Sequence, residues 1–265
     1  MRSTRNYKNL NMLFLRQLEG FYMKKIEKNI IIKYEDRNVI LPEELKTKIT
    51  EFWKNAVKEN PKLFNGENFI IESTSETENI IEMKAVKSNY SHYLYNERIG
   101  IKEEKYRACS PWTGILLQTN DDYFVIGEAD STTSIPYVLQ ITGGQMDKSD
   151  VIDGKLDLAH NLKRELKEEL NLNLDEIDYR FKFIEYPNEN RNAYGFIALG
   201  MIDKTKEELQ KYFEEYRKYL IDNNLETEIG RLVFLKKEIA VEQLDSMQNY
   251  KRPYLRELIE IAREK

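Results

Sequence analysis

Cysteine and histidine are scarce in this sequence of 265 residues. The one cysteine, Cys109, excludes an internal disulfide framework and fits a reducing cytoplasm, where we expect the protein to reside. The two histidines, His92 and His160, have no partner in the sequence that points to nucleophilic or zinc-dependent chemistry. These scarcities argue against a disulfide-stapled fold and against a zinc enzyme.

Long hydrophobic runs and an excess of positive charge are also missing. No apolar stretch suggests a membrane span, so we expect no membrane partner. The formal net charge of -5 and the pI of about 5.5 argue against a non-specific nucleic-acid binder, so no nucleic-acid partner is expected either. The hydrophobic content of 41% is still enough to build a sizeable core.

The pattern of the chain predicts three parts. Residues 1–22 are basic and form an extension for which we predict no defined structure, since the apolar run at 13–15 is too short for a signal peptide. Residues 23–105 predict a small α+β lobe, with strands at 30–34, 69–71 and 80–83 and an amphipathic helix that starts at Pro42.

Residues 106–265 predict a mixed α/β domain. Strands are expected at 113–119 and 123–127, joined by a hairpin turn, and at 137–142, 179–186, 194–202 and 228–235. Helices are expected after Asp157, at 206–220 and at 253–263. The strand at 137–142 is expected to end at Gly143 and Gly144, because glycine pairs mark turns.

The helix after Asp157 carries the pattern on which the functional prediction rests. A leucine recurs every four residues from Leu158 to Leu170, so one stripe can be buried, and Asp157 is a suitable N-cap. Glu165, Glu168 and Glu169 stand at i, i+3 and i+4 and therefore share one face. Three carboxylates that close repel one another unless a divalent cation lies among them, although a solvated acidic surface is the alternative.

Together with the preceding loop, this helix resembles the Nudix hydrolase family, whose box runs G-x5-E-x7-R-E-U-x-E-E-x-G-U, where U is apolar. The second half matches at Arg164, Glu165, Leu166, Glu168, Glu169 and Leu172, and Gly144 is the best start. Two positions differ: Asn171 replaces the last glycine, and Asp150 stands where the first glutamate belongs. The loop before Arg164 is also six residues longer than the family pattern.

The resemblance implies an α/β/α sandwich and a pyrophosphatase that needs Mg²⁺ or Mn²⁺ to hydrolyse the diphosphate linkage of a nucleoside diphosphate derivative. It assigns the metal to Glu165, Glu168, Glu169 and the Gly144 carbonyl, and it makes Arg164 the partner that orients a box carboxylate. The general base stays open between a box glutamate and a later loop, where Glu226 and Glu228 are candidates.

The front segment, the long box loop and the Asn-Glu-Asn-Arg loop at 188–191 resemble the branch of the family that hydrolyses UDP-sugars such as UDP-glucose. For the substrate, this resemblance suggests His92, Arg98, Arg191 and Glu228. The alternative for the aromatic segment 90–98 is a packing element between the two lobes. Trp112, Tyr137 and Phe183 could stack on a base, but each fits a core or strand position as well.

Two expectations remain about the site. Residues 145–156 and 90–98 are expected to border the same cleft as the acidic helix, with the long loop reaching over a ligand. The rival function is a non-catalytic Nudix-like module that senses a nucleotide metabolite, but such a module would be expected to lose box carboxylates. The oligomeric state stays open, with a homodimer among the alternatives.

Overall fold

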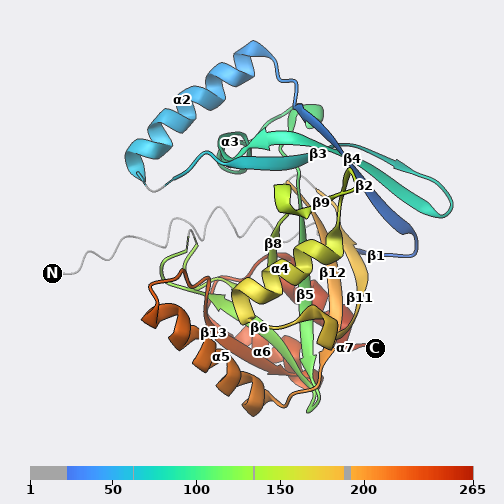
Figure 1. Ribbon diagram of the computed structural model, residues 1–265, viewed down its shortest axis with the longest axis vertical. Coiled ribbons are helices and arrows are strands. Elements are labelled where there is room, and N and C mark those ends of the chain that lie inside the picture. Colours follow the sequence, from blue (N-terminus) through green and yellow to red (C-terminus); the bar gives the residue numbers. More distant parts are fainter. Residues whose placement is uncertain (1–22, 62, 134, 188–191, 265) are drawn as a thin grey trace.

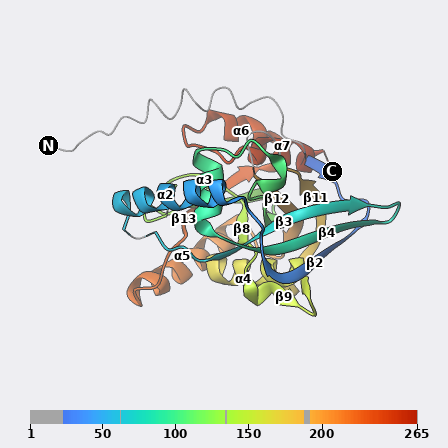
Figure 2. The ribbon, with the colours of Figure 1, turned by 90° about the horizontal axis from the view of Figure 1, so that it is seen from above.

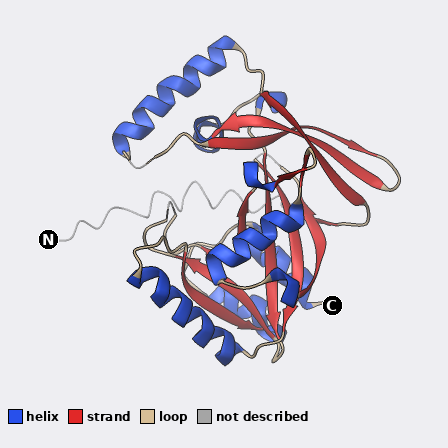
Figure 3. Ribbon diagram, in the orientation of Figure 1, coloured by secondary structure: helices blue, strands red, loops and turns tan. Residues whose placement is uncertain are grey.

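The computed structural model describes residues 23–61, 63–133, 135–187 and 192–264, and the predicted extension 1–22 lies outside this range. Two β-sheets with flanking helices make up the described chain, as Figures 1 and 3 show, so the predicted mixed α/β class is confirmed. In the described residues, no helix combines the length and the apolar character that crossing a membrane requires.

The smaller sheet lies at the top of Figure 1 and has the order β3-β4-β2-β10-β9. Its strands are β2 (Asn29–Asn38), β3 (Glu67–Glu76), β4 (Ile80–Asn89), β9 (Val151–Ile152) and β10 (Lys155–Leu156). The helices α2 (Glu43–Glu59) and α3 (Tyr90–Arg98) belong to the same lobe. β2 and β4 pair in parallel, and α2 lies between β2 and the β3–β4 hairpin in the chain.

The larger sheet has eight strands, with the main order β1-β11-β12-β5-β6-β13. The strands are β1 (Met23–Lys25), β5 (Ser110–Thr119), β6 (Tyr123–Ala129), β7 (Leu139–Gln140), β8 (Thr142–Gln145), β11 (Asp178–Glu185), β12 (Ala193–Ile202) and β13 (Ile229–Lys236). β12 and β5 pair in parallel, whereas the other pairs of this sheet are antiparallel. The predicted hairpin between β5 and β6 is confirmed, and Asp122 supplies its positive φ of 66°.

Helices cover both faces of the larger sheet. One face packs its apolar side chains against α4 (Leu158–Leu170) and α5 (Lys206–Asp222). The other face packs against α6 (Ala240–Ser246) and α7 (Tyr254–Arg263). The predicted α/β/α layering is therefore present, and the short helix α6 was missed because seven residues carry too little periodicity.

An apolar cluster joins the two sheets. Ile32 and Phe69 of the smaller sheet share this cluster with Met146, Ile184 and Phe196 of the larger domain. The view from above in Figure 2 shows the smaller sheet lying across the helices and strands of the larger domain. Strands also cross the predicted boundary near residue 105: β1 pairs with β11 in the larger sheet, and β10 pairs with β2 in the smaller one. The division into lobes stays a prediction, since neither sheet is built from one side of that boundary alone.

The strand predicted at 137–142 is wrong in its limits. Tyr137 has a φ of +63° and lies before β7, and β8 runs through Gly143 and Gly144 instead of ending there. Both glycines pair with β5, where Gly143 faces Gly114 and Gly144 faces Thr113. Because a side chain at Gly143 would collide with the neighbouring backbone, the strand needs glycine here for close approach and not for a turn.

Candidate active site

Helix α4 forms as the leucine pattern predicts. The carboxylate of Asp157 accepts hydrogen bonds from the backbone N–H groups of Ala159 and His160, which are among the donors left unpaired at a helix start. Leu162, Leu166 and Leu170 are buried against the larger sheet. The helix ends at Asn171, whose φ of 55° and ψ of 23° confirm that it takes the left-handed conformation usually supplied by glycine.

The glycine strand β8 brings backbone directly against the acidic face of α4. The Gly143 N–H donates to Oε2 of Glu169 at 3.1 Å. A Cβ placed on Gly144 would lie 2.5 Å from both carboxylate oxygens of Glu165, well inside van der Waals contact. Only residues without side chains therefore let this strand approach the two carboxylates, and the sequence pattern of two glycines before an acidic helix has this physical cause.

Two of the three predicted carboxylates are buried. Glu165 is 7% and Glu169 4% exposed, whereas Glu168 faces solvent. Burial raises the pKa of Glu165 to about 7, with the charges of Glu228 and Glu168 adding to the effect. Burial, followed by the charges of Glu165 and Glu228, raises the pKa of Glu169 well above its ordinary value. Two carboxyl groups that are costly to ionise and lie side by side mark a candidate functional site.

Arg164 links this pair to the long box loop. Its Nη1 lies 2.9 Å from Glu165 Oε1 and 3.0 Å from Glu168 Oε2, and its Nη2 lies 3.1 Å from Asp150 Oδ2. Burial disfavours the charge of Arg164, yet Asp150 and Glu165 together raise its pKa above the ordinary value. The guanidinium therefore stays charged and ties three carboxylates from the helix and the loop together.

Asp150 is the fully buried anchor of the loop. It accepts hydrogen bonds from Asn161 Nδ2 at 2.9 Å and from the backbone N–H of Asp147, and it lies 3.0 Å from His160 Nδ1. Burial opposes its charge, but the hydrogen bond from Arg164 and those from Asp147 and His160 hold the pKa of Asp150 below the ordinary value. The loop is thus tied to α4 through Asp150, which contacts Arg164, His160 and Asn161 of that helix.

Glu228 is the candidate base that lies closer to the cluster. Its charge contributes to the raised pKa of both Glu165 and Glu169. Partial burial, and then the charges of Glu168 and Glu226, raise the pKa of Glu228 itself. Glu226 acts on Glu228 but is not among the main influences on the two buried carboxyls. Glu228 immediately precedes β13, so the start of that strand holds the carboxyl whose charge acts on the two buried glutamates.

The chemistry of this cluster fits a divalent cation. Glu165 and Glu169 offer hard oxygen donors that are buried, mutually repelling and packed against the glycine strand. As the side chains stand, the described His, Cys, Asp and Glu residues form no group of three that could already hold a metal ion. Arg164 supplies the positive charge beside Glu165 and Glu168 in this arrangement. The donor types and their burial are those that Mg²⁺ or Mn²⁺ requires.

A cavity of about 140 Å³ lies beside the glycine strand β8 and extends to helix α3 of the smaller lobe. Tyr93 and Glu97 of α3 line it together with Gly143 and Gly144. The rest of its lining is Trp112, Gln140, Ile141, Gln145, Ala193, Arg252 and Tyr254. None of the described residues that line this cavity belongs to α4, so the expectation that segment 90–98 borders the same cleft as the acidic helix stays a prediction. Arg252 was missed, because nothing in its sequence neighbourhood distinguishes it from a surface arginine.

The residues that the sequence suggested for substrate binding lie in different places. His92 is 1% exposed, and its ring nitrogens lie 2.8 Å from Ser88 Oγ and 2.9 Å from the Tyr106 carbonyl; its substrate role stays a prediction. Arg98 is exposed in the last turn of α3 and does not line the cavity. Arg191 lies outside the described residues.

The three aromatic residues that could stack on a base lie in different environments. Trp112 lines the cavity, and its ring centroid lies 5.1 Å from that of Tyr254. Phe183 is 1% exposed in the core, and Tyr137 is 55% exposed and does not line the cavity. Trp112 is therefore the one of the three that is placed to meet a ligand there.

The long box loop is folded into regular elements, and whether it reaches over a ligand stays a prediction. Its first residues form the end of β8, and the remainder makes a short 3₁₀ turn followed by the β9–β10 hairpin. That hairpin joins the smaller sheet, where Leu156 pairs with Ile32. Gln145 alone from this loop lines the cavity among the described residues. The insertion thus fastens the glycine strand to the front lobe, and its apolar residues Val151 and Leu156 drive this by packing into the cluster between the sheets.

No family model and no curated protein matches the chain. Solved structures similar to it include the NUDIX domain of Shewanella oneidensis NrtR complexed with ADP ribose, which is 13% identical, with 67% of this chain and 98% of that chain covered and a TM-score of 0.40. A NUDIX hydrolase from Alicyclobacillus acidocaldarius is 11% identical; the match covers 59% of this chain and 96% of that chain, with a TM-score of 0.40. The MutT protein from Methanosarcina mazei Go1 is 13% identical, with 57% and 90% covered and a TM-score of 0.37. Likenesses this low settle neither activity nor ligand.

Proposed function

We propose that the protein is a Nudix-type hydrolase that cleaves the diphosphate linkage of a nucleoside diphosphate derivative with the help of Mg²⁺ or Mn²⁺. The observation that carries the proposal is the packing of the glycine strand against Glu165 and Glu169, two buried carboxyl groups on one face of α4. Burying two carboxylates side by side is costly, and a cation bound between them would offset that cost.

Glu165, Glu169, the more exposed Glu168 and the backbone carbonyl of Gly144 would hold the cation. When bound, it neutralises the diphosphate oxygens and acidifies the attacking water. The protein's own part is orientation: Arg164 clamps Glu165 and Glu168, and the Gly143 N–H holds one oxygen of Glu169. A planar guanidinium is suited to this because it fixes the direction of the carboxylates as well as their charge.

Glu228 is the residue that we assign as general base. Its pKa is raised, mainly by burial, which makes its carboxylate a stronger base toward water. Its charge acts on both buried glutamates. The proton would pass to the Glu228 carboxylate as the water oxygen attacks one phosphorus of the diphosphate. The bond from that phosphorus to the bridging oxygen would break, and the bridging oxygen would leave as part of the other phosphate.

The cavity beside the glycine strand is the proposed place for the group attached to the diphosphate. Its volume of about 140 Å³ is below the range of whole-ligand pockets, so it would take one ring of a nucleoside or sugar. Tyr93 and Trp112 provide aromatic faces, and Arg252 provides a cation. A UDP-sugar such as UDP-glucose is one member of this class.

Replacing Arg252 with alanine should raise KM for the preferred substrate about tenfold with little change in kcat, because Arg252 would contact the ligand away from the cleaved bond. The matched control is Arg256→Ala. Arg256 follows on α7 and pairs with Asp245 and Glu260 on the exposed surface. Steady-state kinetics decide: equal KM values for the two variants would remove Arg252 from the substrate site.

The experiment for the activity itself is product release from a panel of nucleoside diphosphate compounds, including UDP-glucose and ADP-ribose, with and without Mg²⁺. We expect turnover of at least one compound with the metal and none after exhaustive chelation, restored when Mg²⁺ is returned. Turnover that survives chelation would contradict the metal-dependent chemistry. Binding of a compound without turnover would favour a nucleotide-sensing module instead.

A further inference from the structure

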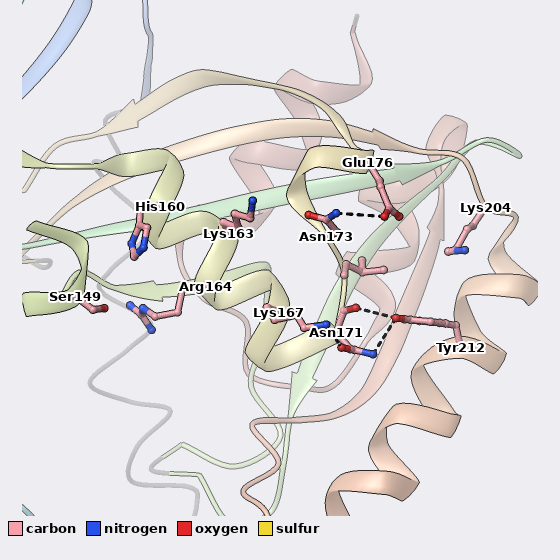
Figure 4. Close-up of a pocket in the computed structure, with 11 residues that line it drawn as sticks. Ser149, His160, Lys163, Arg164, Lys167, Asn171, Asn173, Glu176, Lys204 and Tyr212 are labelled. Carbon is pink, nitrogen blue, oxygen red and sulfur yellow. Dashed lines mark hydrogen bonds between the residues drawn. The ribbon is translucent and has the colours of Figure 1, made fainter. Parts of the chain in front are cut away.

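A second and larger cavity, of about 840 Å³, lies on a different face of the same helix. Figure 4 shows its lining, which comes from α4, the 3₁₀ turn before β9, the segment after α4, the β12–α5 connection and α5. Lys163 and Lys167 of α4 line it, whereas Glu165 follows Lys163 by two residues, a rotation of about 200° around the helix. The buried carboxylates therefore point away from this cavity.

The lining of the cavity is strongly cationic in a protein whose formal net charge is -5. Lys163, Arg164, Lys167 and Lys204 line it, and His160 lies beside them. Glu176 is the single carboxylate in the described lining. Positive charge gathered in a concave site attracts anions, because the low-dielectric walls focus the field toward the solvent inside.

The partners of these cations differ. Arg164 is held by Asp150, Glu165 and Glu168, and Lys163 lies 2.5 Å from Asp175. Lys167 instead donates to the neutral side-chain oxygen of Asn171, and Lys204 stands 5.4 Å from the centre of the Tyr212 ring. Neither of these two lysines has a carboxylate within ion-pairing distance in the part of the chain that the structure describes.

The floor between those two lysines is rigid. The Tyr212 hydroxyl donates to the Asn171 carbonyl at 2.8 Å, and Asn171 Nδ2 donates back to the same hydroxyl at 2.9 Å, as drawn in Figure 4. This reciprocal pair ties the end of α4, which carries Lys167, to α5, which follows Lys204 closely in the chain. Two unneutralised cations set apart on a fixed frame suit a ligand with more than one anionic group.

We propose that this cavity is a binding site for a small anion that carries two or more linked phosphates, and that this site lies beside the catalytic cluster, with Arg164 between the two. Lysine binds phosphate as a point charge, so Lys167 and Lys204 would each take one phosphate group, with Lys163 beside them. The volume of about 840 Å³ exceeds what one inorganic phosphate fills and falls within the range of small-molecule sites. Binding of the anion would depend mainly on Lys167 and Lys204, because Arg164 already forms ion pairs with Asp150, Glu165 and Glu168.

The test uses inorganic tripolyphosphate as the probe, measured by titration calorimetry on the full chain in EDTA. Chelation leaves the catalytic glutamates without a cation, so they repel the probe and cannot account for its binding. The variant is Lys167→Ala/Lys204→Ala. The control is Lys58→Ala/Lys211→Ala, which removes the same charge from exposed positions on α2 and α5 that do not line the cavity.

We expect saturable binding of one tripolyphosphate, weakened at least about tenfold in the cavity variant and less than about twofold in the control. Orthophosphate should bind at least about tenfold more weakly than tripolyphosphate, because it reaches one lysine only. The proposal is overturned if the wild-type protein shows no saturable binding, if both double variants bind alike, or if orthophosphate binds as tightly as tripolyphosphate. Thermal unfolding of both variants checks that each remains folded.

Discussion

A Glu169→Gln variant is expected to fold normally and to lose at least about 100-fold in kcat on the preferred substrate. The amide has nearly the same shape, and its carbonyl oxygen can still accept the hydrogen bond from the Gly143 N–H. It cannot supply the negative charge that holds a cation. Because burial and the charges of Glu165 and Glu228 make the ionised form of Glu169 costly, the neutral variant should be at least as stable as the wild type without metal.

The measurement pairs kinetics at saturating Mg²⁺ with thermal unfolding in EDTA. Glu215→Gln is the matched control, since Glu215 is an exposed position on α5, far along the chain from the cluster. Glu168→Gln should also lose turnover, and comparing it with Glu169→Gln weighs the exposed against the buried carboxylate. Wild-type turnover in Glu169→Gln would mean that the acidic face of α4 is ordinary surface, and the site assignment would fall.

Replacing Gly143 with alanine should destabilise the protein by more than about 3 kcal/mol. The added Cβ would lie 2.1 Å from the Thr113 carbonyl oxygen and 2.5 Å from Gly114 Cα, and backbone atoms of a central strand cannot move aside cheaply. The φ of +143° is in addition a conformation that side chains rarely adopt. Since β8 carries the glycine that faces Glu165, activity should disappear with the fold.

The control separates crowding from backbone strain. Gly100 has a φ of +84° and nothing within 4 Å of an added Cβ, so Gly100→Ala meets only the conformational cost of about 1 kcal/mol. Denaturant unfolding of both variants gives the two free energies. Equal losses of stability would show that the close packing of β8 on β5 does not require a glycine at position 143.

The sequence could predict α4 in detail because its signals are local. Asp157 caps, the leucines repeat with the helical period, and Asn171 ends the helix, all within one short segment. The strand limits near Gly143 failed for the opposite reason. A glycine pair usually marks a turn, and only the partner strand β5 reveals that these glycines serve close contact.

The surroundings of the site were harder to predict because they depend on contacts between distant segments. His92 lies in an aromatic segment that suggested contact with a substrate. In the structure its side chain is buried and contacts Ser88 and the Tyr106 carbonyl. The box insertion is polar enough to suggest a loop that reaches over a ligand, yet its apolar residues Val151 and Leu156 pack in the cluster between the sheets and its hairpin joins the smaller sheet. Arg252 enters the proposed substrate cavity only because α7 packs behind the glycine strand, which no local pattern encodes.

The central claim is that the buried carboxylates of α4 hold a divalent cation, and Mn²⁺ binding followed by electron paramagnetic resonance tests it most directly. The wild-type protein should bind Mn²⁺ saturably, and Mg²⁺ should compete for the site. The Glu165→Gln/Glu169→Gln variant should lose this binding by at least about 100-fold, while the Glu215→Gln control keeps it. Equal Mn²⁺ affinity in the wild type and in the double variant would contradict the claim.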